Sequence, residues 1–287
     1  MSTPASAVRP ARPAVTVVIA VWDRYCTLLA EAVGSVLTQE SVDVELIVVD
    51  NASTAPLPPL PPEVTVLRSR DRLSAGAARN LGLTRVSMPA VLFLDADDVL
   101  LPGALHRLHD LLRSHPGAVA AVCKRLLWDP VSQTERINER SPRPLVYRLC
   151  RWPRAFAALT LRYDVFQLTG CALLDTGVVR DAGGFGDASL AEDWMLRSAL
   201  AARGRVVFGR NPVVRFRVSG DSLWHREHSR EELDGTYAAF RAHRLSDPRL
   251  PRWGRALMPL IAAGHGHDIR RLTATGPFRP VEPGLQR

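Results

Sequence analysis

The sequence lacks the cysteine spacing of a metal site or a disulfide scaffold. Its four cysteines, Cys26, Cys123, Cys150 and Cys171, lie far apart, and no two of them form a Cys-x-x-Cys pair. A structural zinc site or a disulfide framework is therefore not expected. The pattern predicts reduced, mostly structural thiols, as in a cytoplasmic protein.

A run of roughly 18 apolar residues, long enough to cross a bilayer, is also missing. The run from Val15 to Trp22 superficially resembles a signal peptide, but it is short and lacks a small-residue cleavage pattern. We therefore predict a cytoplasmic protein. Peripheral contact of a basic surface with the inner face of the membrane stays open.

The positive charge is carried almost wholly by arginine. A total of 37 Lys and Arg against 29 Asp and Glu gives a net charge of +8, which suits phosphate-bearing ligands or an anionic surface without identifying either. No Lys/Arg run is interleaved with aromatic residues, so no nucleic acid is expected as a partner. With 287 residues, of which 46% are hydrophobic, the chain can form one large α/β domain or two modest ones.

Apolar runs alternate with helical periodicities between residues 14 and 94. Residues 1–13 have no periodicity and are predicted to be a disordered leader. The patterns predict buried strands at 15–21, 44–49, 64–67 and 90–94, and helices at 28–37 and 74–83. This order of elements predicts a parallel α/β sheet whose ligand lies beyond the carboxyl ends of the strands.

Acidic residues directly follow three of these strands. Asp23, Asp50 and Asp95 each fall just past a strand end, so all three are expected at one edge of the sheet. Asp97 and Asp98 add two carboxylates beside Asp95. Such a cluster needs solvent, basic partners or a cation, and its hard oxygen ligands favour Mg2+ or Mn2+. The alternative is an acidic turn in which Asp97 or Asp98 caps the next helix.

Six segments occur in the order and spacing seen in inverting GT-A glycosyltransferases of the family-2 type. They are VTVVIAVWDR, VELIVVDNAST, SAGAARNLGL, VLFLDADDVL, GCALLD and GGFGDASLAEDWML. The sequence resembles this family over about residues 14–220. The resemblance implies a GT-A fold, an α/β fold with a mostly parallel central sheet flanked by helices, in which a Rossmann-like nucleotide-binding half joins an acceptor half. It also implies a nucleoside-diphosphate sugar donor, a divalent metal and direct displacement at the anomeric carbon.

The resemblance assigns donor binding to residues at the strand ends. Asp50 matches the family's carboxylate that accepts a hydrogen bond from the nucleobase, and Ala20, Val21 and Asp23 would line the same pocket. The alternative for Asp50 is a turn-forming Asp-Asn pair.

Arginines near the third strand and the following helix allow two interpretations. Arg79 matches the family's arginine that contacts the nucleotide, although a helix-surface arginine would give the same pattern. For Arg70 and Arg72 the surface interpretation is favoured.

The metal-binding Asp-x-Asp motif of the family matches Asp95 and Asp97. By resemblance, Asp95 reaches the ribose or a metal-bound water, and Asp97 ligates the cation, Mg2+ or Mn2+, that bridges the donor phosphates. Asp98 is left open between a ligand, a helix cap and a solvent-exposed side chain.

The acidic pair of the family matches Glu192 and Asp193 at the start of a predicted helix. By resemblance, Asp193 is the catalytic base that removes a proton from the attacking hydroxyl. Glu192 is a structural or acceptor-binding neighbour, and Trp194 either supports an acceptor or fills core. The alternative is two acids placed in the first turn by the helix dipole.

A late histidine of the family has no direct counterpart. Relatives often carry it after a Tyr-Arg-x strand, whereas Ser219 follows Phe216-Arg217-Val218 here. His225 and His228 lie close by in sequence and could substitute.

We predict one GT-A glycosyltransferase domain over residues 14–245, with the nucleotide-sugar half at 14–122 and the acceptor half at 123–245. Residues 125–165 are rich in Arg and Pro and are interpreted as a flexible or acceptor-facing insertion. Later patterns predict helices at 190–202 and 230–243 and strands at 206–208 and 213–218. Residues 246–287 are predicted to be a partly flexible C-terminal extension.

The donor sugar and the acceptor are not encoded in motifs this general. A UDP-sugar is the favoured donor, and a glycan, a lipid-linked glycan or a small molecule remains open as acceptor. One alternative is a haloacid-dehalogenase-like phosphohydrolase, because Phe93-Leu94-Asp95-Ala96-Asp97 also resembles a strand that ends in a nucleophile and an acid. Another is a non-catalytic nucleotide-sugar or glycan-binding protein. A nucleotidyltransferase is disfavoured because no glycine-rich loop follows the first strand.

Overall fold

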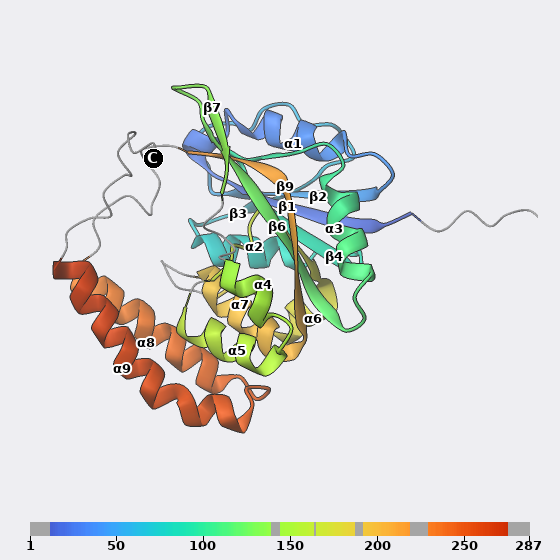
Figure 1. Cartoon of the computed structure of the whole chain (residues 1–287). Coiled ribbons are helices and arrows are strands. Elements are labelled where there is room, and N and C mark those ends of the chain that lie inside the picture. Colours follow the sequence, from blue (N-terminus) through green and yellow to red (C-terminus); the bar gives the residue numbers. More distant parts are fainter. Residues whose placement is uncertain (1–11, 139–143, 164, 187–191, 219–228, 275–287) are drawn as a thin grey trace, which may run out of the picture.

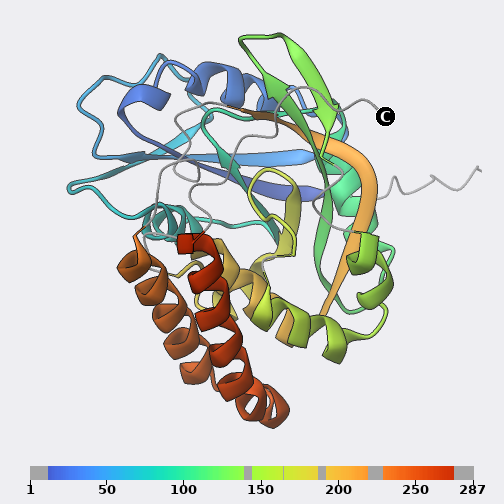
Figure 2. The same ribbon diagram turned by 60° about the vertical axis from the view of Figure 1, so that its left-hand side comes forward.

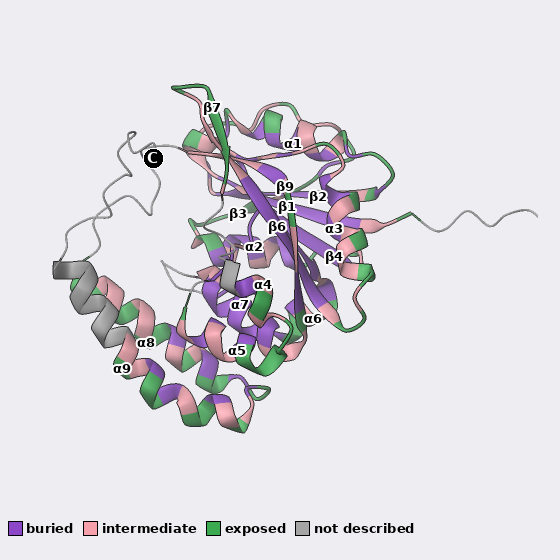
Figure 3. Cartoon of the chain, in the orientation of Figure 1, coloured by how far each residue is buried: buried purple, intermediate pink, exposed green. Residues whose placement is uncertain are grey.

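The computed structural model describes residues 12–138, 144–163, 165–186, 192–218 and 229–274. Within these ranges the strands form one mixed, mostly parallel sheet, in the order β3-β2-β1-β4-β8-β6-β9-β5, with β7 paired to β6. Helices flank the sheet, with α1 and α2 on opposite sides of its first strands (Figure 1). Buried residues of the sheet and of the helices and loops that cover it form one large core (Figure 3).

The first half of the chain follows the predicted pattern. Its strands are β1 (Ala14–Val21), β2 (Asp43–Asn51), β3 (Thr65–Ser69) and β4 (Ala90–Asp95), and its helices are η1 (Asp23–Tyr25), α1 (Leu29–Leu37) and α2 (Ala75–Leu83). The order β3-β2-β1-β4 is parallel throughout. The predicted α/β fold is confirmed, and each predicted end in this half lies within two residues of the observed one.

The second half contains more regular structure than its sequence pattern indicated. Its elements are β5 (Val99–Leu100), α3 (Ala104–Arg113), β6 (Ala118–Asp129), β7 (Thr134–Ile137), α4 (Pro144–Leu149), α5 (Pro153–Arg162), β8 (Ala172–Asp175), α6 (Thr176–Asp181), α7 (Glu192–Arg203) and β9 (Arg205–Arg217). Strand β8 is antiparallel to β4 and β6, whereas β6 and β9 are parallel.

The flexible interpretation of residues 125–165 is wrong for most of the described part, which folds into strands and helices. Register shifts along the β6·β9 pair interrupt the two-residue alternation that marks a strand. Strand β6 also buries two cationic side chains, Lys124 and Arg125, where an apolar residue is the usual occupant. Because of both features, the later part of β6 does not show the apolar pattern by which a buried strand is recognised in a sequence.

The last two helices, α8 (Arg230–Ser246) and α9 (Arg252–Ala274), lie side by side at one end of the molecule (Figure 2). They pack on α5 and α7. A second, smaller core joins these four helices through Leu161, Trp194, Met195, Phe240, Leu250, Met258 and Ile261. Among the described helices, none has the length and apolarity needed to traverse a bilayer.

Candidate active site

The strand register brings the predicted donor-side residues together at one edge of the sheet. Val21 pairs with Asp50, and Ala20 pairs with Asp95. Asp23 follows directly in η1. The expectation that Asp23, Asp50 and Asp95 lie at one edge of the sheet is therefore confirmed.

Asp50 is held by an arginine that the sequence analysis did not single out. Its side chain is 2% exposed, and its Oδ2 accepts a hydrogen bond from Arg68 Nη1 at 2.7 Å. Its Oδ1 accepts from the Ser53 backbone N–H at 3.0 Å, and Arg68 also donates to the Ser53 carbonyl at 2.8 Å. Asp50 thus stabilises a turn, as the alternative interpretation held, and is paired with Arg68.

Asp23 lies in the left-handed region, with φ of 33°. Its carboxylate accepts from the Thr54 hydroxyl at 2.7 Å and the Thr54 backbone N–H at 2.8 Å, and these bonds lower the pKa of Asp23. Arg72 lies 3.7 Å from this carboxylate and stacks on Trp22, 3.4 Å from the ring centroid. Arg72 is exposed, as expected, and its guanidinium lies beside Asp23 and Trp22.

Arg79 of α2 connects the two acidic clusters. Its Nη2 lies 2.8 Å from Asp95 Oδ1, and its Nη1 lies 2.7 Å from Glu192 Oε1. The side chain is 10% exposed. A Cβ on Gly76, one turn earlier in α2, would lie 2.2 Å from the Gly186 carbonyl oxygen, so only glycine permits this close approach. The acids of β4 and those of α7 therefore share one site.

Three carboxylates crowd the turn after β4, and their pKa values diverge. Burial raises the pKa of Asp95, but the ion pair with Arg79 outweighs it, so this pKa lies below its usual range. Burial and the charge of Asp95 raise the pKa of Asp97 to about 6. Burial and the charges of Asp95 and Asp97 raise the pKa of Asp98 well above its usual value.

Asp98 is buried, with 1% exposure, so the solvent-exposed alternative is wrong. Its Oδ1 accepts from the Arg217 backbone N–H at 3.1 Å, which ties the acidic turn to β9. Its Oδ2 is buried and has no hydrogen-bond partner within the described part of the chain.

The strand-end carboxylates fit a divalent cation of the hard type. The described ranges contain no group of three or more His, Cys, Asp or Glu side chains that would form a complete metal cage. A Mg2+ or Mn2+ site built from one or two carboxylates and substrate phosphates does not need such a cage. Burial and the neighbouring charge of Asp95 raise the pKa of Asp97, and a cation bound at this carboxylate would favour its ionised form.

Asp193 lies in the first turn of α7, next to Glu192. Its side chain is 15% exposed. Burial and the charge of Glu192 raise its pKa to about 7, against the opposing pull of Arg79 and Arg125. Arg197, one turn later, places Nη2 2.8 Å from Asp193 Oδ2.

Trp194 is 5% exposed and lies in the smaller core. Its indole N–H donates to the Thr160 carbonyl at 2.6 Å, and its ring stacks on Phe240 with centroids 4.0 Å apart. Of the two roles that the sequence left open, this position fits the core-filling one.

Arg125 of β6 is a site residue that sequence reasoning missed. Its guanidinium is buried and donates to the Thr169 carbonyl and hydroxyl at 2.7 and 3.0 Å. Its charge favours the ionised forms of Asp98 and Asp193. No local pattern marks it, because its hydrogen-bond partner Thr169 lies 44 residues away in sequence. His225 and His228 lie outside the described residues.

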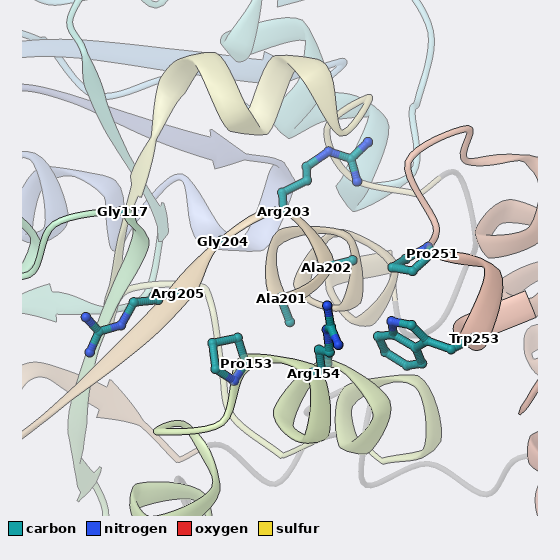
Figure 4. Close-up of a pocket in the computed structure, with 11 residues that line it drawn as sticks. Gly117, Pro153, Arg154, Ala201, Ala202, Arg203, Gly204, Arg205, Pro251 and Trp253 are labelled. Carbon is teal, nitrogen blue, oxygen red and sulfur yellow. The ribbon is translucent and has the colours of Figure 1, made fainter.

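A hollow of about 460 Å3 lies at the other end of α7, beside the starts of β6 and β9 (Figure 4). Because β6 and β9 run in the same direction as β4, this hollow is at the sheet edge opposite the acids. It is lined by Gly117, Pro153, Arg154, Ala157, Ala201, Ala202, Arg203, Gly204, Arg205, Pro251 and Trp253. None of the predicted site residues lines it.

Comparison with solved structures shows that this mixed, mostly parallel α/β sheet with its flanking helices is GT-A-like. S. aureus TarS 1–349 in complex with UDP-GlcNAc superposes with a TM-score of 0.64 at 15% identity, over 91% of this chain and 74% of that one. The mannosyltransferase PcManGT from Pyrobaculum calidifontis, in complex with GDP-Man and Mn2+, gives a TM-score of 0.60 at 19% identity, over 93% and 77%. At these identities the likeness shows the fold.

The family follows from the sequence match. The model of glycosyl transferase family 2 matches residues 16–172, more than half of the chain. The chain belongs to glycosyl transferase family 2, as its motifs predicted, and this assignment leaves no place for the phosphohydrolase alternative.

Curated relatives match over shorter stretches. The uncharacterized protein MT1568 of Mycobacterium tuberculosis (strain CDC 1551 / Oshkosh) is 31% identical over 137 residues, 45% of this chain and 42% of the relative. The succinoglycan biosynthesis protein ExoO of Rhizobium meliloti (strain 1021) is 34% identical over 101 residues, 33% of this chain and 29% of the relative. The matched stretch thus spans less than half of each of these relatives.

Proposed function

We propose that this chain is an inverting glycosyltransferase that moves a sugar from a nucleoside-diphosphate sugar to an acceptor hydroxyl. One observation carries the proposal: Arg79 contacts both Asp95 and Glu192, so the strand-end acids and the α7 acids face a common site. Displacement with inversion needs leaving-group stabilisation on one side of the anomeric carbon and a base on the other. The acids of α7 would supply the base, and the strand-end acids would hold the cation that stabilises the leaving group.

On the donor side, the nucleoside would lie against Ala20, Val21 and Asp50. Asp50 would accept from the nucleobase, and Asp95 would reach the ribose. UDP-GlcNAc in TarS and GDP-Man in PcManGT support a nucleoside-diphosphate sugar, with a UDP-sugar favoured. Asp97, assisted by Asp95, would hold Mg2+ or Mn2+, and the bound ion would neutralise charge on the departing diphosphate.

On the acceptor side, Asp193 would take the proton of the attacking hydroxyl. The hydroxyl oxygen forms the new bond to the anomeric carbon, and the bond to the diphosphate breaks with its electron pair on the leaving oxygen. A carboxyl whose pKa is about 7 suits proton transfer near neutral pH. Glu192, held by Arg79, would contact a glycan, lipid-linked or small-molecule acceptor beside it.

Asp193→Asn tests the base. The substitution keeps the shape of the side chain, so binding of the donor should persist while sugar transfer falls by about 100-fold or more. Donor binding is measured as a thermal shift across UDP-, GDP- and dTDP-sugars with Mn2+, and turnover as donor hydrolysis. Unchanged turnover in the variant would eliminate Asp193 as the base. A wild-type protein that binds a donor but never consumes it would favour the non-catalytic alternative.

A further inference from the structure

Arg197 is a completely buried guanidinium one helical turn after the candidate base. Its Nη2 lies 2.8 Å from Asp193 Oδ2. Its Nη1 donates to the backbone carbonyl of Phe166, and its guanidinium carbon lies 5.4 Å from the centroid of the Phe166 ring. A buried cation is costly unless it is paired, so helix formation alone does not explain an arginine here.

We propose that Arg197 is the positioning residue of Asp193: it fixes the orientation of this carboxylate and favours its ionised form. The inference rests on the proposed function, because it takes Asp193 as the base. The two residues are four positions apart on one helix, so their side chains lie on the same face, with the acid nearer the N-terminus in the favoured order. The Phe166 carbonyl holds the guanidinium from outside the helix, so the carboxylate is oriented by a group that is itself fixed.

The charges around Asp193 explain why this contact matters. Glu192 and Asp95 are negative neighbours that disfavour its ionised form, and the Cys171 thiol also lies within electrostatic range. Arg79 and Arg125 oppose them from α2 and β6. Arg197 is the cation in direct contact with the carboxylate.

Arg197 remains charged under neutral conditions. Burial, and then the charge of Arg125, lower its pKa to about 9, which is still above neutral pH. A cation in contact with a carboxyl lowers the pKa of that carboxyl, so removal of Arg197 raises the pKa of Asp193. The base is then protonated over a wider range of pH, and the acidic limb of the rate profile moves upward.

Arg197→Met and Arg197→Lys test the proposal, with Arg244→Met as the matched control. Arg244 is also fully buried and ion-paired, at 2.8 Å from Asp247, but it lies in α8 away from the acids. The measurements are the pH profile of donor turnover, kcat and KM separately, and the melting temperature of each variant.

Arg197→Met should lower kcat about tenfold or more at pH 7 and move the acidic limb up by about 1 to 3 pH units, with little change in the KM for the donor. Arg197→Lys keeps the charge but cannot contact Asp193 and the Phe166 carbonyl through two separate nitrogens of a guanidinium. The acidic limb of its pH profile should therefore stay near that of the wild type, while kcat falls. Arg244→Met should lose thermal stability and keep the wild-type pH profile.

The proposal would be overturned if Arg197→Met kept the wild-type kcat and the wild-type acidic limb of the pH profile. It would also be overturned if Arg244→Met moved the acidic limb by the same amount as Arg197→Met. Should the methionine variant fail to fold, Arg197→Gln carries the same expectation and the same refutation. Failure of the proposed function looks different, because the wild type would then bind a donor without consuming it. Failure of the base assignment alone would leave Asp193→Asn with full turnover, whatever the Arg197 variants show.

Discussion

Replacing Arg79 by methionine should destabilise the protein by about 3 kcal/mol, because it leaves two carboxylates without their shared cation. Loss of one partner from a buried ion pair costs about 3–5 kcal/mol. The lower end applies here, since the side chains of Asp95 and Glu192 keep 29% and 18% exposure and retain some hydration. Methionine preserves the apolar stem, so the change isolates the charge.

The expected loss is large enough to measure by thermal denaturation. In a domain of this size about 1 kcal/mol corresponds to about 2–4 °C, so the melting temperature should fall by about 6–12 °C. The difference from the wild type should narrow as the pH falls toward 4. At that pH the orphaned carboxyl of Asp95, no longer held ionised by Arg79, takes up a proton and loses the uncompensated charge.

Two further variants sharpen the test of Arg79. Adding Glu192→Gln to Arg79→Met removes one orphaned carboxylate, so the double variant should melt above the single one. Arg85→Met, just past the end of the same helix at an exposed position, should change stability by no more than about 0.5 kcal/mol. An Arg79 variant that melts within 2 °C or so of the wild type, or a double variant no more stable than the single, would refute the reasoning.

Three other perturbations have defined outcomes. The folded-state pKa of Asp98 lies above its unfolded value, so the stability that the protonated Asp98 contributes is present below about pH 4 and is lost as the pH rises through the folded-state pKa. Asp98→Asn should therefore raise the melting temperature at pH 8 in EDTA but not at pH 4. An equal change in melting temperature at both pH values would contradict this reasoning. Gly184→Ala should melt lower than Gly183→Ala, since both glycines have positive φ but only a Cβ at Gly184 would lie 2.3 Å from the Asn80 amide oxygen; equal melting temperatures would show that this contact relaxes freely. EDTA should abolish turnover and added Mn2+ should restore it, with Asp97→Asn needing more Mn2+, whereas activity that survives chelation would mean that the aspartates serve another purpose.

The first half of the fold was readable because three of its strands, β1, β2 and β4, are buried on both faces over most of their length. Such strands appear as unbroken β-branched and aliphatic runs, as in Val15 to Val21, and their ends are marked by polar turn residues. Parallel pairing then places Asp50 and Asp95 at the same edge of the sheet, without knowledge of any side-chain contact.

The arginines of the site could not be read in this way. Arg68, Arg125 and Arg197 each acquire a role through a partner that is distant in sequence or through burial, and a local pattern records neither. An arginine in an amphipathic helix is ordinarily exposed, so Arg197 gave no signal of its burial. Sequence motifs thus located the acids and Arg79, whereas the roles of Arg68, Arg125 and Arg197 required coordinates.

Helix α7 is clamped at both ends, and this has a practical consequence for fragments and chimaeras. At its far end Arg203 contacts Asp247 at 2.6 Å, and near its start Trp194 and Met195 share a core with Phe240, Leu250 and Met258. A protein truncated at residue 245 would lose Asp247, Leu250 and Met258, and with them the ion pair of Arg203 and part of the core around Trp194 and Met195. It would still contain every motif of the family. Grafting experiments should therefore carry the C-terminal helical pair together with the helix that bears Asp193.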